Sequence, residues 1–215
     1  MDEEITIIDA NTRNEKIRIF FVKNKKILII IISTIIFLSI GYLSFDQISK
    51  RNKAKLVNQF NSIIIDYNNA TEKGKIINDL SVLIKKKDKT YSPLALYFLI
   101  DNNLIKNKNE VNNLFNILID KTNLELEIKN LLIYKKALYN SDFIKENELI
   151  KILNPIINSE SIWKSHALYL IAEFFYSNNE REKAKEFFNQ ILILPNSNNS
   201  IKLESQKRLN RDLSE

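Results

Sequence analysis

One run of apolar residues dominates the hydrophobic pattern of this chain. Residues 27–45 carry no charge and read ILIIIISTIIFLSIGYLSF. At about 1.5 Å of rise per residue, a helix of this length spans roughly 28 Å, close to the thickness of the hydrocarbon core of a bilayer. Because backbone polar groups at that depth must bond within their own segment, the run predicts a transmembrane α-helix.

The run differs from a cleavable signal peptide in three ways. It follows a mostly polar segment, residues 1–26, and it is longer than the roughly 7–15 apolar residues of a signal sequence. No small-x-small cleavage motif stands before Asp46. We therefore expect an uncleaved anchor.

Basic residues lie unequally on the two sides of the anchor. Six precede it and four follow it closely: Arg13, Lys16, Arg18, Lys23, Lys25 and Lys26 against Lys50, Arg51, Lys53 and Lys55. Because positive flanks favour the cytoplasm, we expect residues 1–26 to form a cytoplasmic tail and residues 46–215 to form a domain on the other side. The tail has an acidic start, followed by Ile17, Phe20 and Phe21 at helical spacing among basic residues. Either a short amphipathic helix on the inner leaflet or a positive flank that sets orientation fits this pattern.

After the anchor, apolar residues recur at steps of three and four, which is typical of amphipathic helices. No Pro or Gly separates Phe45 from Asn69, so the membrane helix is expected to continue outward and dock on the domain. A further helix follows Gly74, and Ser92–Pro93 opens the next one. From Tyr91 onward the pattern predicts three helix pairs and a polar capping helix: 91–104 with 109–121, 124–138 with 146–157 (stopped around Asn154–Pro155), 161–176 with 180–194, and 200–213.

Composition restricts the fold class. The chain has two glycines and three prolines, too few for the tight turns of a sheet protein of this size, so we expect an all-α fold. Cysteine is absent, which excludes disulfides and thiol chemistry. The net charge of +6 includes a cluster at Lys85, Lys86, Lys87 and Lys89. No nucleic-acid recognition motif accompanies this cluster, so a solvated helix end is preferred over a phosphate-binding patch, and no nucleic-acid partner is expected.

The third helix pair has the spacing of a tetratricopeptide unit. Large apolar residues and a small one occupy the first helix, and an alanine and an aromatic residue occupy the second: Leu168, Ile171, Ala172 and Phe175, then Ala184, Phe188 and Ile191. Val111, Phe115 and Leu118 repeat the second-helix spacing at one constant offset. The pattern therefore predicts a tetratricopeptide-like α-solenoid of helix pairs behind a single N-terminal transmembrane helix.

The whole arrangement resembles the family of the ancillary SecYEG translocon subunit (YfgM-like), whose domain is shared with a cell-division coordinator. The resemblance is carried by SIWKSHALYLIAEFFYSNNEREKAKEFFNQILILP and by TRNEKIRIFFVKNKK before the anchor. It implies a bacterial inner-membrane protein with a periplasmic domain. It also implies contacts with Sec translocon subunits, periplasmic chaperones or exported chains.

Catalytic chemistry has little support in the sequence. His166 is the only histidine, and no further metal-ligand types gather around it. Glu125/Glu127 and Glu146/Glu148 lie two apart, on different sides of a helix, so we expect no acid–base pair, no cofactor and no enzyme activity. If the third pair is a tetratricopeptide unit, its concave face carries the predicted partner-binding residues His166, Tyr169, Glu173 and Tyr176.

Two functions remain open on this reading. The first is an accessory subunit of the protein-export machinery that binds protein partners. The second is a self-associating scaffold that organises envelope assembly or cell division.

Overall fold

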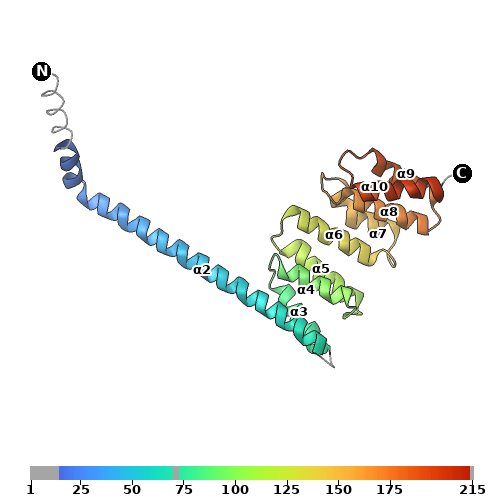
Figure 1. The fold of residues 1–215 in the computed structure, drawn as a ribbon, viewed down its shortest axis with the longest axis horizontal. Helices are drawn as coiled ribbons and strands as arrows, with labels where there is room; N and C mark the ends of the chain where they lie inside the picture. The colour runs from blue at the N-terminus through green and yellow to red at the C-terminus, as the bar shows by residue number, and fades with distance from the viewer. Residues whose placement is uncertain (1–14, 70–72, 214–215) are drawn as a thin grey trace, which may run out of the picture. The chain divides into compact units, whose positions relative to one another are not determined.

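The computed structural model describes residues 15–69 and 73–213. Within these ranges the regular secondary structure is entirely helical, which confirms the all-α prediction for the part described (Figure 1). The acidic start of the tail and Arg13 lie outside the described residues. By its internal contacts the chain divides into two units, residues 1–56 and 57–215, and each is considered by itself.

The predicted anchor lies within one long helix, α2 (Lys25–Asn69). Its large apolar side chains are open to the surroundings: Phe37 is 78% exposed and Tyr42 is 74% exposed. Two hydroxyls in the apolar run bond back to their own helix, Thr34 Oγ1 to the Ile30 carbonyl and Ser39 Oγ to the Ile35 carbonyl, each at 2.8 Å. In the described part of the chain, α2 is the one helix long and apolar enough to cross a membrane.

The last turns of α2 belong to the second unit and pack on its core. Ile63 is buried, and Phe60 and Tyr67 pack beside it. The Phe60 ring lies 5.8 Å from that of Tyr91, and the Tyr67 ring lies 5.0 Å from that of Phe98. The predicted docking of this helix is therefore confirmed for its end, whereas Phe45 and Ile48, which share its apolar spacing, are exposed.

The second unit continues as helices that fold back on one another in hairpins. Their bounds are α3 (Gly74–Lys85), α4 (Tyr91–Asp101), α5 (Lys108–Lys121), α6 (Leu126–Asn140), α7 (Glu146–Ile157), α8 (Lys164–Ser177), α9 (Arg181–Ile193) and α10 (Asn199–Arg211). Each helix packs on the next in the chain, and α3, α6 and α8 also contact the helix two further on: α5, α8 and α10 respectively. Successive helices therefore form hairpins, and three pairs of alternate helices also touch. For reference, we call α4, α6, α8 and α10 the first row and α3, α5, α7 and α9 the second row.

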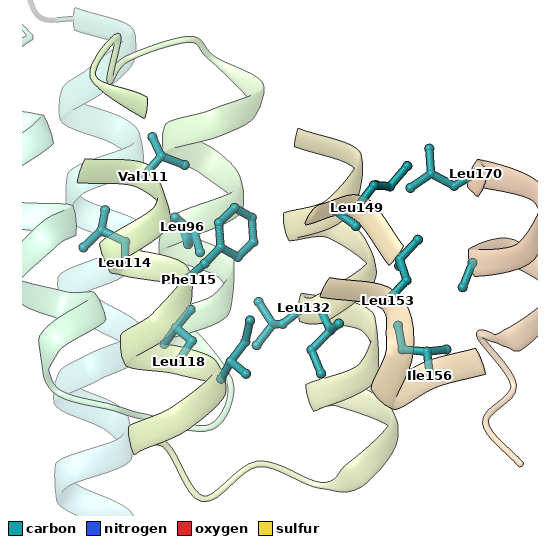
Figure 2. Close-up of a cluster of buried hydrophobic side chains, with 14 of the residues drawn as sticks. Leu96, Val111, Leu114, Phe115, Leu118, Leu132, Leu149, Leu153, Ile156 and Leu170 are labelled. Atoms are coloured by element: carbon teal, nitrogen blue, oxygen red, sulfur yellow. The ribbon is translucent and has the colours of Figure 1, made fainter. Parts of the chain in front are cut away.

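One burial pattern recurs in the second row. Positions i, i+4 and i+7 are buried in α5, α7 and α9 alike: Val111, Phe115 and Leu118; Leu149, Leu153 and Ile156; Ala184, Phe188 and Ile191. The middle set was not predicted from the sequence. Figure 2 shows the first two sets packed together with Leu96 of α4 and Leu132 of α6. One continuous core therefore runs through successive hairpins.

Helix ends in this unit depend on asparagine and aspartate. Asp88 Oδ1 accepts hydrogen bonds from the backbone N–H groups of Thr90 and Tyr91, so it caps α4. The buried Ser92, expected to open this helix, instead donates its hydroxyl to the Leu83 carbonyl at 2.9 Å and ties α4 to α3. Asn107 caps α5 in the same way that Asp88 caps α4.

Two helices in the first row end with an asparagine in the left-handed region. Asn103 has φ 51° after α4, and Asn179 has φ 62° after α8. The residue after each, Leu104 and Glu180, donates its N–H back to a carbonyl in the last turn at 2.9 Å. This is the Schellman arrangement, in which asparagine replaces the usual glycine.

The helix α7 has the expected bounds, and Pro155 lies within its last turn. The missing N–H of Pro155 removes one hydrogen bond to the preceding turn, and the helix ends two residues later. Leu203, one of the few apolar residues of α10, is 64% exposed.

Candidate functional site

The four residues predicted to bind a partner lie along α8, facing its neighbours in the first row. His166 lies between α8 and α6, where its ring centroid is 5.9 Å from that of Tyr134 and 5.1 Å from that of Trp163. Tyr134 and Trp163 stack at 6.0 Å. Burial in this aromatic cluster lowers the pKa of His166, because the charged imidazolium loses hydration. The space between α6 and α8 is therefore filled by the chain itself.

The other three residues face α10. Arg208 of α10 pairs with Glu173 at 2.7 Å, and its guanidinium lies 5.1 Å above the ring of Tyr176. The ring of Tyr169 packs 5.5 Å from that of Phe188, and burial, followed by the hydrogen bond and charge of Glu173, raises the pKa of the Tyr169 phenol. All four predicted residues are thus half-buried in contacts within the chain. Their role in binding a partner stays a prediction.

The corresponding space between α4 and α6 is open. It forms a groove of about 360 Å³. Most of its lining is apolar, with one lysine and one glutamate: Lys89, Thr90, Pro93, Leu94, Tyr97, Leu124, Glu125, Ile128 and Leu131. Leu94 is 41% exposed and Ile128 is 39% exposed, so two large aliphatic side chains remain in contact with solvent.

Tyr97 lines this groove with its ring. Its hydroxyl is buried and has no hydrogen-bond partner among the described residues. Burial, reinforced by the charge of Asp101, raises the pKa of Tyr97 to about 12, so the phenol stays protonated at neutral pH. The Lys135 ammonium of α6 lies 4.8 Å from the Tyr97 ring centroid, within the range of a cation–π contact, and so links α6 to α4.

The arrangement suits binding of an apolar segment. A shallow groove between two helices accepts large apolar side chains of a peptide or an amphipathic helix. Periodicity did not reveal this groove, because Leu94 and Ile128 look like core positions in sequence. In the structure, neither Leu94 nor Ile128 is among the residues that its helix buries.

The acidic pairs considered for catalysis have structural contacts. Glu127 accepts a hydrogen bond from Ser161 Oγ at 2.8 Å, and Glu146 pairs with Lys183 at 3.0 Å. Over residues 15–69 and 73–213, no three His, Asp or Glu side chains gather in a way that could hold a metal ion. The expectations of no cofactor and no enzyme activity stay predictions.

A scan of protein-family models and comparisons with curated proteins and with solved structures found no match to this chain.

Proposed function

We propose that this protein is a non-enzymatic, membrane-anchored accessory protein whose helical domain binds polypeptide partners. The sequence resembles the family of the ancillary SecYEG translocon subunit, and this resemblance supports a role as an ancillary subunit of the bacterial Sec translocon. Its partners would be translocon subunits, periplasmic chaperones or exported chains.

The first part of this proposal is that the hairpins are tetratricopeptide-like repeats. Three observations support it. Successive helices form hairpins, and several alternate helices also touch. The helices α5, α7 and α9 share the same i, i+4, i+7 pattern of burial. Each helix of the third pair buries a small residue, Ala172 in α8 and Ala184 in α9. Repeats of this kind stack so that each unit buries the apolar face of the next.

The second part is membrane topology. We place residues 27–45 in the inner membrane, with the N-terminus in the cytoplasm and residues 46–215 in the periplasm. The excess of basic residues before the run supports this orientation. The internally bonded hydroxyls of Thr34 and Ser39 support insertion, because a bilayer offers them no water.

The third part is the binding site. We assign it to the groove between α4 and α6, and one observation carries this choice. Along the first row, aromatic side chains fill the space between α6 and α8, and Arg208 closes the space between α8 and α10. The groove between α4 and α6 instead keeps two exposed aliphatic side chains in its lining, Leu94 and Ile128. An apolar segment of a partner would bury both of them.

Site-specific photo-crosslinking in intact cells tests this assignment. A photoreactive amino acid replaces Leu94 or Ile128, and the matched control replaces Val82 of α3, which is 43% exposed and lies outside the groove. We expect crosslinks from the two groove positions to translocon subunits, chaperones or exported chains, and few from Val82. Equal crosslinking from all three positions would contradict the groove assignment.

The same experiment separates the two functions that the sequence left open. If the proteins crosslinked to the groove positions are division or cell-wall proteins, the role as a scaffold is favoured over the role in protein export. Leu94→Glu and Ile128→Lys should each abolish the crosslinks formed by the other groove position, because a charge in an apolar contact is costly to bury. Val82→Glu should leave them unchanged.

A further inference from the structure

A short helical segment precedes the predicted anchor. Residues 15–23 are helical, Asn24 lies in a turn, and α2 begins at Lys25. Asn24 N donates to the Phe20 carbonyl and Leu28 N donates to the Asn24 carbonyl, each at 3.0 Å, so bonds of the helical type continue through Asn24. The Asn24 side chain also donates to the Phe20 carbonyl at 3.0 Å.

Apolar and basic side chains are ordered around this helix. Ile17, Phe20 and Phe21 share one face, since they lie three and four residues apart, and they are 48%, 57% and 56% exposed. At about 100° per residue, Lys16 and Lys23 border this face on one side and Arg18 borders it on the other. Ile19 and Val22 lie on the opposite face. The face of Ile17, Phe20 and Phe21 therefore has basic residues at both edges, and Ile19 and Val22 make the opposite face apolar without such a complete border.

The charge of the segment is strongly one-sided. Between residues 15 and 26 the basic residues are Lys16, Arg18, Lys23, Lys25 and Lys26, and Glu15 is the one acidic residue. A lysine or arginine at the edge of an apolar face can keep its charge at the level of lipid headgroups while its aliphatic stem covers apolar surface. The complementary surface is therefore an interface of apolar chains and negative headgroups.

We propose that the helix of residues 15–23 lies flat on the bilayer and binds anionic phospholipid headgroups. Ile17, Phe20 and Phe21 enter the boundary between headgroups and acyl chains, and the flanking cations pair with lipid phosphates. This inference rests on the proposed insertion of residues 27–45, which holds the helix at the surface. It adds a lipid-binding site on the cytoplasmic side, separate from the groove between α4 and α6.

Depth measurement with a spin label tests the proposal, and the absence of native cysteine makes labelling specific. The full chain carries Phe21→Cys or, as the matched control on the opposite face, Val22→Cys. It is reconstituted in vesicles of phosphatidylcholine alone or with one quarter phosphatidylglycerol. Accessibility to oxygen and to a polar nickel chelate, present on both sides, reports the depth of the nitroxide.

We expect the label at position 21 to be shielded from nickel in the anionic vesicles and the label at position 22 to stay accessible. In phosphatidylcholine alone, shielding at position 21 should fall at least about threefold, because each basic residue contributes to attraction by anionic lipid. Replacing Lys16, Arg18, Lys23 and Lys25 by glutamine should remove the difference between the two lipids. High salt should also reduce it, because it screens the charges.

Two results would overturn the inference. The first contradicts the surface helix alone, and the second also contradicts the proposed membrane insertion. If the protein floats with the vesicles but both labels are equally accessible in both lipids, the surface helix is wrong and the anchor is unaffected. If the protein does not float with vesicles at all, the proposed insertion is wrong, and this inference is overturned with it.

Discussion

Arg208 of α10 and Glu173 of α8 form a two-pronged ion pair, with Nε 2.7 Å from Oε1 and Nη2 2.8 Å from Oε2. Their side chains are 28% and 27% exposed, so the pair is partly removed from water. The remaining Nη1 donates to Asp212 at 2.8 Å. The guanidinium groups of Arg211 and Arg208 hold the pKa of the Asp212 carboxyl well below its usual range. This network fixes the last helix to the domain.

A double-mutant cycle with Arg208→Ala and Glu173→Ala should give a coupling energy of about 1–2 kcal/mol, because paired, partly desolvated charges interact more strongly than exposed ones. Urea unfolding of the full chain in mild detergent, followed by circular dichroism, measures it. The control cycle uses Lys207 and Glu204, which are 2.7 Å apart and 65% and 52% exposed. It should give about 0.5 kcal/mol or less, and equal couplings would contradict the role assigned to Arg208.

His166 should make stability depend on pH in a narrow window. Burial lowers its folded pKa below the ordinary 6.5, so the folded state binds fewer protons than the unfolded state there. Stability should therefore be complete above pH 6.5 and should fall as the pH drops through 6.5 toward the folded pKa. Because His166 is the only histidine, His166→Gln should remove the contribution of histidine titration to the change in the free energy of unfolding between pH 7.5 and 5.5. An identical change in both proteins would contradict the prediction.

Two buried asparagines should respond oppositely to the same substitution. Asn130 of α6 is 3% exposed, and its Nδ2 has no partner among the described residues. Asn130→Leu should stabilise the domain by roughly 1 kcal/mol, since it removes an unpaired buried donor. Asn140 instead exchanges two 2.9 Å hydrogen bonds with Asn112, so Asn140→Leu should destabilise by roughly 1–3 kcal/mol. Thermal unfolding of both variants checks the signs, and a loss of stability in both would refute the first.

The backbone at Asn179 should discriminate among substitutions. Its φ of 62° suits glycine and asparagine but is strained for β-branched residues. Asn179→Gly should leave the melting temperature nearly unchanged, whereas Asn179→Val should cost roughly 1–2 kcal/mol. The neighbouring Asn178 has φ −88°, so Asn178→Val should cost less. Similar losses at both positions would show that side-chain contacts, and not backbone conformation, decide the effect.

The order and type of the helices were predictable, because apolar spacing at three and four residues reports burial directly. Their ends were less so. The expected end of α4 at Leu104 becomes Asp101, because Asn103 turns left-handed and the N–H of Leu104 bonds back to Leu99. The end of α4 therefore depends on the backbone conformation of the single residue Asn103. Hydrophobic periodicity carries no information about that conformation.

The candidate site was predictable only in part. Counting along α8 placed His166 and Glu173 on one face of the helix, and in the structure His166 contacts α6 whereas Glu173 contacts α10. Counting could not show that Trp163 and Tyr134 fill the space beside His166, or that Arg208 reaches Glu173. Those neighbours come from other helices, and spacing within one helix carries no information about them. The groove at Leu94 was missed for the same reason.

The reciprocal amide pair of Asn112 and Asn140 has a consequence for assembly. Because α5, α7 and α9 present equivalent apolar surfaces, hydrophobic contact alone discriminates poorly between correct and shuffled pairing of the helices. The two amides bond each other only when α5 meets α6 in one alignment, and any other partner would leave both Oδ1 acceptors without these bonds, while each Nδ2 keeps a bond within its own helix. We therefore expect the pair to favour the native pairing of α5 with α6 over shuffled pairings.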